Sequence, residues 1–445
     1  MDSMPTSRRG RSGLVVALMV LGASPIMHGP EGVPPAVHFV DVESGPTTGG
    51  PGNLGVPIAI FGSGCGASRG SSRVTIGGVE VASYLVWGTK NALNPTLDAI
   101  VVQPGPAVTG GAIVVSVAGR ASSPTLSFTR NAGKMRYVSA AGSDAADCTD
   151  ATPCATIAHA IEPSVTGPGD TILVRGGTLQ ENEIWVRREY GHGGTPGQQK
   201  TIKAFPGESV ILANGHRPFI ISADHVTVSG FRFQNGKSLG ISELGDASRL
   251  KGNRLVNNAY AGPVGWAFID SHGDGHVIAG NVCEATSSSV GTQGHCYYIS
   301  YGDGVRVIYN IGGGAPGYGI HVFDQRRATV DFRRVISNLV IEGNIVRSST
   351  ERSGMVLSMA DEAGLGNVID TVIIRNNVLT ANNHLGLTIL GNVRDVRVYH
   401  NTFVENGRQA LTWDRGRSSP TSISGTICSC SRRTRCAGVT ARGTA

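Results

Sequence analysis

The sequence predicts an all-β protein in which an immunoglobulin-like β-sandwich is followed by a right-handed parallel β-helix. Gly accounts for 63 of 445 residues and aromatic residues for only 6%, a composition typical of turn-rich β structure. Between Val226 and Trp413 an apolar motif with a Gly-Asn or Asn-Asn pair recurs at intervals of roughly 20–35 residues, which is typical of a solenoid. Within each copy the apolar residues alternate with a period of two, which indicates strands.

The copies of this motif begin at similar apolar positions, and most are followed by a second short strand that starts from a small residue. They are VTVSGFRF (Val226–Phe233), LKGNRLV (Leu250–Val256), VIAGNVC (Val277–Cys283), VRVIYNI (Val305–Ile311), LVIEGNIV (Leu339–Val346), VIIRNNVL (Val372–Leu379) and VRVYHNTF (Val396–Phe403). Several short strands per turn, stacked turn on turn, predict a parallel β-helix.

One Asn occupies the same place in each of six copies. These residues are Asn253, Asn281, Asn310, Asn344, Asn377 and Asn401. Asn tolerates the left-handed backbone conformation, so each is expected to turn a corner between strands. Stacked strands lie about 4.8 Å apart, so the side chains are also expected to hydrogen-bond from coil to coil. We therefore predict a structural role for them.

The first 30 residues are predicted to be a signal peptide and leader. Three arginines (Arg8, Arg9, Arg11) precede a short apolar run, Leu14–Ala23, which is the order found in secretory signals. The run is too short to span a bilayer. The predicted location is therefore extracellular, with no membrane insertion after signal cleavage.

The cysteines agree with export to an oxidising compartment. Cys148 and Cys154 lie in a polar, turn-rich segment without metal-ligand spacing, which predicts a local disulfide. Cys283 and Cys296 flank a Ser/Gly-rich loop, and a bridge between neighbouring coils is the expectation there. Cys65 is expected to be buried and unpaired.

Residues 36–130 form a row of short alternating strands separated by Gly/Pro/Ser turns, the pattern of a β-sandwich. The stretches GPTTGG, IAIFGSGCG, VTIGGVEV, VVQPGPAVTGG and SSPTLSFT resemble the IPT/TIG domains. Cys65 stands where that family usually has an aromatic residue. The resemblance implies a spacer or a weak binding module.

Residues 136–420 are predicted to form the β-helix. The opening RYVSAAGSDAADCTDATPCATIAHAI and the following GDTILVRGGTL resemble pectate-lyase-like β-helix proteins with PbH1 repeats. In those proteins an amphipathic helix caps the open end of the stack, and Thr156–Ile161 is the candidate cap here. The resemblance concerns the fold rather than one reaction, because the R-x-P-x-x-R element of many pectate lyases is absent.

Residues 421–445 are expected to be an aberrant or disordered tail, because strand periodicity stops there. The formal net charge of +6 comes from the two ends of the chain, and the part between them is neutral. No basic body therefore argues for nucleic acid as a partner. The predicted partner, implied by the resemblance, is a polysaccharide, and the predicted state is a monomer.

Aligning the second strands on their small first residue places one outward-facing residue of each coil in a column. The column reads Ser242, Phe268 or Ile269, Tyr298, His321, Val356, Thr388 and Thr412. Tyr298 and His321 are therefore expected to be vertical neighbours, one strand spacing apart.

A cluster of His, Tyr, Asp and Arg on adjacent coils has the groups needed for β-elimination on a uronate-containing polysaccharide. The predicted catalytic base and acid come from His321, Tyr298 and His295. Predicted substrate contacts, which include a group that neutralises the carboxylate, are His272, Gln293, Ser300, Asp324 and Arg326. Ca²⁺ held by Asp270 and Asp274 is the alternative neutralising group. A catalytic role requires that Tyr298 and His321 share one groove and are not buried.

Two other functions fit the same residues. Hydrolysis needs two carboxylates at a defined separation, and several Asp are present although no Asp-Asp pair is. A non-catalytic glycan-binding or adhesion protein of the cell surface needs only an exposed polar and aromatic face. The first reaction to test is therefore elimination, with glycan binding as the alternative from another class.

Overall fold

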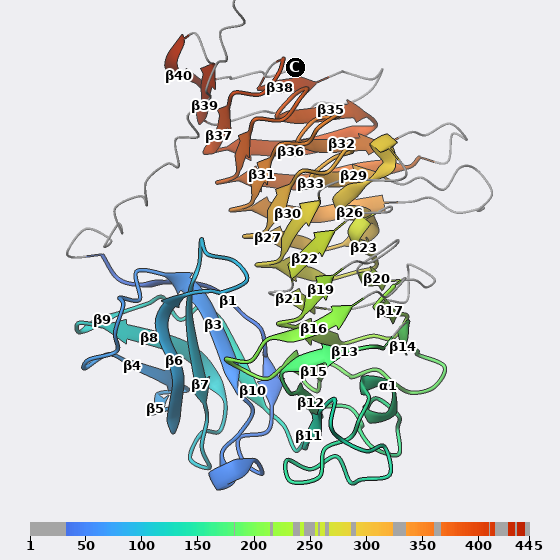
Figure 1. Cartoon of the computed structure of the whole chain (residues 1–445). Helices are drawn as coiled ribbons and strands as arrows, with labels where there is room; N and C mark the ends of the chain where they lie inside the picture. Colours follow the sequence, from blue (N-terminus) through green and yellow to red (C-terminus); the bar gives the residue numbers. More distant parts are fainter. Residues whose placement is uncertain are drawn as a thin grey trace, which may run out of the picture.

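The computed structural model describes residues 33–181, 183–213, 217–234, 241–243, 254–256, 259–262, 267–285, 291–323, 335–359, 366–408, 410–413, 426–431 and 434–440. The predicted all-β fold is confirmed: an antiparallel two-sheet unit is followed by a long stack of parallel strands (Figure 1). The predicted signal peptide lies outside the described residues. None of the helices in the described part is long and apolar enough to cross a membrane.

The N-terminal unit consists of two sheets that pack face to face. One sheet has the order β1 (Ala36–Val40), β3 (Ile58–Ser63), β7 (Asp98–Gln103), β6 (Ser83–Lys90). The other has the order β2 (Ser44–Gly45), β10 (Leu126–Arg130), β8 (Gly111–Val117), β4 (Arg73–Ile76), β5 (Val79–Glu80), with β9 (Arg120–Ala121) paired to β8. A short 3-10 helix, η1 (Pro51–Asn53), lies between β2 and β3.

The parallel strands form three faces, to which each full coil contributes one strand. Face 1 contains β11 (Met135–Val138), β12 (Thr171–Val174), β15 (Lys200–Ala204), β18 (Val226–Ser229), β21 (Arg254–Val256), β24 (Val277–Ala279), β27 (Arg306–Ile308), β30 (Val335–Glu342), β33 (Val368–Arg375) and β36 (Val393–Tyr399). Face 2 contains β13 (Gly177–Leu179), β16 (Val210–Ala213), β19 (Arg232–Gln234), β22 (Ala259–Gly262), β25 (Val282–Ala285), β28 (Ile311–Gly313), β31 (Ile345–Arg347), β34 (Val378–Thr380) and β37 (Asn401–Val404).

Face 3 completes each coil. It contains β14 (Ile184–Val186), β17 (Phe219–Ile221), β20 (Ile241–Glu243), β23 (Ala267–His272), β26 (His295–Asp303), β29 (Ile320–Phe323), β32 (Met355–Met359), β35 (Leu387–Gly391) and β38 (Leu411–Trp413). The inward side chains of all three faces build one continuous apolar core along the stack. The outward side chains of face 3 are those that the sequence aligned in a column.

A ladder of buried Asn side chains runs from coil to coil along the corner between face 1 and face 2, as predicted. The Nδ2 atom of each donates to Oδ1 of the next, at 3.0 Å from Asn281 to Asn310, 3.0 Å from Asn310 to Asn344, and 2.9 Å from Asn344 to Asn377. A further step of 2.9 Å reaches Asn401. Each Oδ1 also accepts the backbone N–H of the previous ladder residue, so the ladder fixes main chain as well as side chain.

The expectation that these Asn adopt the left-handed conformation is wrong. The residue before each ladder position has the positive φ instead: Gly280 (66°), Tyr309 (55°), Gly343 (67°), Asn376 (58°) and His400 (55°). The first letter of each Gly-Asn or Asn-Asn pair therefore turns the corner, and the second letter points its side chain into the stack.

One copy of the motif was placed out of register. The strand Arg254–Val256 pairs residue for residue with Val277–Ala279, which precedes the corner at Gly280 and Asn281. In the copy Leu250–Val256 the strand therefore follows Asn253, whereas the prediction placed it before that residue. Asn253 itself lies outside the described residues. The apolar pattern around it is short, and either register matches the period of two.

The N-terminal end of the stack is capped as predicted. Helix α1 (Ile157–Ala160) begins after Thr156, whose Oγ1 accepts the His159 N–H at 3.1 Å. The Glu181 carboxylate accepts the first two helical N–H groups, from Ile157 at 2.7 Å and Ala158 at 2.9 Å. These acceptors satisfy amides that have no partner inside so short a helix.

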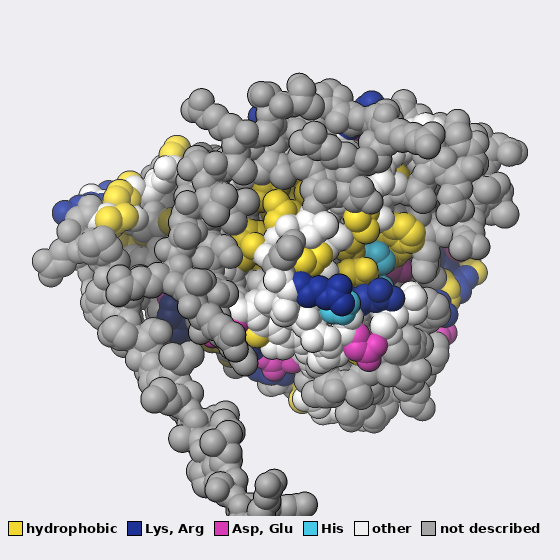
Figure 2. All heavy atoms as spheres, turned by 90° about the horizontal axis from the view of Figure 1, so that it is seen from above, with side chains coloured by type: hydrophobic (Ala, Val, Ile, Leu, Met, Phe, Trp, Pro, Cys, Tyr) yellow, Lys and Arg dark blue, Asp and Glu magenta, His cyan; other side chains and the backbone are white. Residues whose placement is uncertain are grey.

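At the other end of the stack, the expectation that strand structure stops at residue 421 is wrong. Strand β39 (Thr426–Ser431) pairs in parallel with β37 and extends face 2, and β40 (Thr434–Thr440) folds back on it antiparallel (Figure 1). Seen from this end, Figure 2 shows apolar side chains of the described part beside a row of basic ones.

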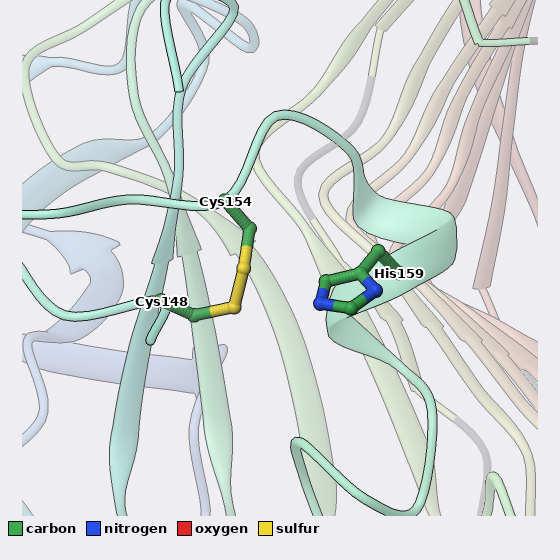
Figure 3. A group of neighbouring side chains, drawn as sticks. All are labelled: Cys148, Cys154 and His159. Carbon is green, nitrogen blue, oxygen red and sulfur yellow. A yellow bond between two sulfur atoms is a disulfide. The ribbon is translucent and has the colours of Figure 1, made fainter. Parts of the chain in front are cut away.

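Two disulfides are present. Cys148–Cys154 is confirmed, and His159 lies beside it (Figure 3). Cys283–Cys296 also forms, but it joins face 2 to face 3 of one coil rather than bridging neighbouring coils as expected. Among the described cysteines, Cys65 is buried and free, as predicted, and burial raises the pKa of its thiol to about 12.

The sandwich docks firmly on face 1 of the β-helix. Apolar side chains of β1, β3 and β7 pack against Ala279 and Ile308. Beside them Lys203 forms a buried ion pair with Asp41, donates to the Pro57 carbonyl at 3.0 Å, and shares the carboxylate with the Ser229 hydroxyl. A flexible spacer would not bury charges in this way, because an ion leaves water only where it is fully partnered.

Replacing a ladder residue tests the role of the Asn stack. Asn344→Ala removes the acceptor of two Asn310 donors and the donor to the Val307 carbonyl, all of them buried. We expect a loss on the order of 3 kcal/mol in the free energy of unfolding, measured by urea denaturation. The control Asn383→Ala, at an exposed position, should change stability little. Equal losses in both variants would contradict a specific role for the ladder.

Candidate functional site

Face 3 brings the predicted column together. The pairing register runs Ser242, Asp270, Tyr298, His321, Val356, Thr388, Thr412. Tyr298 and His321 are direct neighbours, as predicted. Asp270 occupies the place predicted for Phe268 or Ile269, both of which are buried in the core. The column therefore presents an acid, a phenol and an imidazole on three successive coils.

The core side of the same strands fixes this orientation. Tyr297, next to Tyr298, is fully buried, and its hydroxyl lies 2.9 Å from the Asn281 carbonyl and 2.8 Å from the Ile311 carbonyl, which share its one proton. Because successive side chains of a strand point to opposite faces, anchoring Tyr297 inward sets Tyr298 outward.

A chain of hydrogen bonds sets the protonation of the two histidines. The backbone N–H of Tyr318 donates to His295 Nδ1 at 3.0 Å, and His295 Nε2 lies 3.1 Å from His321 Nδ1. A backbone N–H can only donate, so the proton of neutral His295 is on Nε2 and is donated to His321 Nδ1. Neutral His321 therefore carries its own proton on Nε2.

Electrostatics keep both rings neutral. Burial, with a smaller effect of Arg352, lowers the pKa of His295 to about 3. Burial, followed by His295 and Arg352, lowers the pKa of His321 well below its usual value. Neither ring offers a free lone pair, because each accepting nitrogen is already occupied. The predicted role of His321 or His295 as a general base would need a free ring lone pair, whereas this arrangement offers an N–H donor.

Aromatic rings surround His321. The ring centroids of Tyr298 and Tyr318 each lie 4.7 Å from that of His321, and Phe323 stacks on it at 5.3 Å. Only 8% of Tyr298 and of His321 is exposed, and 5% of His295. Tyr298 and His321 converge, as the predicted catalytic role requires. That role also requires that neither is buried, and both are.

The predicted substrate-binding residues divide into three groups. Gln293 is exposed and available to a substrate. His272 is buried, and its Nε2 lies 2.9 Å from Asp270 Oδ1. Ser300 is buried at a bulge, because the pairing passes from Ile299 directly to Tyr301, so it offers substrate no open surface. The last two predicted contacts, Asp324 and Arg326, lie outside the described residues.

The structure does not support the predicted Ca²⁺ site. Asp270 contacts His272, whereas Asp274 accepts the Asp303 backbone N–H at 2.9 Å, so the two carboxylates have separate partners. Within the described residues, the set of three potential ligands that does converge is Cys148, Cys154 and His159. Its sulfur atoms form the disulfide in Figure 3 and are not thiolates, so it is not a metal centre in this state.

Two residues of the cluster were missed by the sequence analysis. Tyr318 lies in the turn before β29, and burial raises the pKa of its hydroxyl. Arg352 lies in the turn before β32, is exposed, and donates to Thr292 Oγ1 at 3.4 Å. Neither belongs to a strand, so the column alignment had no means of finding them.

No protein-family model matches the sequence, and no curated protein sequence matches it. Three solved structures are similar to the chain. A pectate lyase is 14% identical with a TM-score of 0.49, covering 67% of this chain and 76% of its own. A family 28 exopolygalacturonase from Yersinia enterocolitica is 12% identical with a TM-score of 0.48, covering 89% and 85%. A rhamnogalacturonan lyase is 12% identical with a TM-score of 0.41, covering 65% and 85%. Identities this low do not bear on the reaction.

The tautomers can be observed directly. We expect ¹⁵N NMR of the imidazoles to show His295 and His321 both neutral and both protonated at Nε2 down to about pH 5, because burial holds the two pKa values below the ordinary 6.5. Signals assigned through His295→Gln and His321→Gln separate them from the exposed histidines. An imidazolium at pH 6, or an Nδ1–H tautomer, would contradict the hydrogen-bond chain.

The same pKa shifts predict the acid stability of the fold. The unfolded chain binds a proton at these positions near pH 6.5, whereas folded His295 does so only near pH 3. Stability is therefore lost as the pH falls from about 6.5 towards 3. His295→Gln should flatten this dependence in urea titrations at several pH values. The control His384→Gln should leave it unchanged.

Proposed function

We propose that the protein acts on an extracellular, uronate-containing polysaccharide, which it cleaves by β-elimination at face 3. One observation carries the proposal: Tyr298 lies between Asp270 and an N–H-donating His321 on adjacent coils, with Arg352 close by. Elimination needs a cation or donor near the uronate carboxylate and a group that exchanges protons with the sugar.

The roles follow from which atoms are available. Arg352 is an exposed guanidinium without a carboxylate partner among the described residues, and it is the group that would neutralise the uronate. His321 would donate its Nε2–H to the enolate oxygen as carbon 5 loses its proton. A neutral imidazole is suited to this, because a buried donor stabilises developing negative charge without first giving up its own proton.

Tyr298 would exchange the protons. Its phenolate oxygen takes the proton from carbon 5, the electron pair forms the carbon 4–carbon 5 double bond, and the bond from carbon 4 to the leaving oxygen breaks. The phenol then protonates that oxygen. The Tyr298 hydroxyl oxygen is itself buried, so this role requires that the substrate displaces the groups that cover it.

Binding without catalysis is the second candidate, and a specific observation favours it. His295, Tyr298 and His321 are buried and packed ring against ring, which is also how a purely structural aromatic cluster would look. In that case the polysaccharide would contact the exposed residues around the cluster, such as Gln293 and Arg352, and no bond would break.

Absorbance near 235 nm distinguishes the two candidates. The purified chain is incubated with pectate, alginate, chondroitin and hyaluronan, with and without Ca²⁺. We expect a rise on one substrate that falls at least about a hundredfold in Tyr298→Phe and in Arg352→Gln, the range typical of lost proton transfer or charge stabilisation.

The matched control is Arg397→Gln, which removes an exposed arginine of face 1 that pairs with Asp395. It should retain full activity. A flat trace on every substrate from folded protein, together with retarded migration in gels containing one polysaccharide, would favour binding alone. A rise that survives Tyr298→Phe would contradict the assigned role of Tyr298.

A further inference from the structure

Two adjoining cavities lie between the sandwich and the edge of the β-helix where faces 1 and 2 meet, away from the cluster on face 3. Their volumes are about 300 and about 320 Å³, and both are lined by Ala92, Leu93 and Arg232. We call them together the junction groove. Its sandwich wall is the loop between β6 and β7, held in place by Asn94, whose Nδ2 donates to the carbonyls of Tyr309 at 2.9 Å and Gly280 at 3.3 Å.

Among the charged residues that line the groove, Arg232 has no ion-pair partner within the described part of the chain. The others are balanced by a carboxylate or a cation: Lys203 by Asp41, Lys90 by Asp98, Glu208 by Arg175, and Glu284 by Arg347. Within the described residues the guanidinium of Arg232 contacts only the Ala92 carbonyl, at 3.3 Å. It is half-buried, so it is shielded from part of the solvent that would otherwise balance its charge.

The groove has an elongated floor. In the register of face 2, Arg232 heads an outward column that continues through β22 to Val282, Ile311 and Ile345. Four strand steps of about 4.8 Å make this column about 19 Å long. At its other end, on the Arg232 side, the first cavity has aromatic walls from Phe61 and Phe205. A sugar ring that has one apolar C–H face and carries a carboxylate matches such a lining.

We propose that the junction groove is a second binding site for an acidic saccharide, and that Arg232 holds its carboxylate in a charge-assisted pair. The negative charge of the ligand follows from Arg232 alone. Its saccharide nature rests on the proposed function. A site here would hold a polysaccharide by its uronate units while the face 3 cluster works on another part of the chain.

Isothermal titration calorimetry tests this on the full chain carrying Tyr298→Phe, which prevents turnover. The probes are tetragalacturonate, its fully methyl-esterified form and benzoate. We expect tetragalacturonate to bind, the uncharged ester not to bind, and Arg232→Gln to weaken binding by about tenfold or more, as expected for a lost hydrogen bond to a charged group. Arg397→Gln, which removes an exposed, paired arginine of face 1 outside the groove, should bind as before.

A second variant tests the groove independently of Arg232, in case Arg232→Gln misfolds. Leu93→Trp fills the groove from the loop side without changing its charge, and it should also abolish binding. Unchanged affinity in Arg232→Gln, or no heat with tetragalacturonate, would overturn the proposal. Binding of benzoate alone, lost in Arg232→Gln, would overturn the saccharide assignment in favour of a small aromatic carboxylate.

The two proposals fail in different ways. Tetragalacturonate binding that depends on Arg232, in a protein that gives no rise near 235 nm, would support binding in the junction groove and contradict the proposed β-elimination. Elimination that is lost in Tyr298→Phe, combined with an affinity that is unchanged in Arg232→Gln, would support the proposed β-elimination and contradict binding in the junction groove.

Discussion

The register between coils is the constraint on which the rest of the molecule depends, and the buried Asn ladder holds it. At each rung, one Asn Oδ1 accepts hydrogen bonds from both the side chain and the backbone of the Asn in the preceding coil. A slip by one residue would turn every core side chain of that strand outward. It would also leave the ladder donors and acceptors unpaired in the core, where each costs about 1–3 kcal/mol. The corners remain tight because the residue before each rung takes the left-handed conformation.

The cluster on face 3 is a consequence of that register. Tyr298 and His321 come together only because their strands pair residue for residue, and His295 reaches His321 from the start of the same strand that carries Tyr298. One backbone amide, that of Tyr318, then determines the position of each proton. A main-chain group outside the strands thus converts a predicted base into a donor. The burial that packs the His295 and His321 rings also lowers both of their pKa values, so the same packing keeps both rings neutral.

The sandwich is part of the architecture of the β-helix. Its loop is bonded to the carbonyls of Gly280 and Tyr309, the same corner residues that precede ladder rungs. The buried Lys203–Asp41 pair fixes the other side of the contact. Docking so close to the corners creates the junction groove, in which Arg232 has no carboxylate partner among the residues that the structure describes. The IPT/TIG resemblance implied a spacer or a weak binding module, and the sandwich supplies one wall of the groove that we propose as a binding site.

The sequence by itself determined the fold class, the Asn ladder, the capping helix, the disulfide Cys148–Cys154 and the neighbouring positions of Tyr298 and His321. All of these follow from local periodicity or from repetition at a fixed place in each coil, which a linear pattern records. Only the tertiary structure decided the tautomers of His295 and His321, the approach of Arg352 and Tyr318, and the solitary charge of Arg232. These depend on turns, burial and contacts between segments far apart in the chain, and no period of two carries that information.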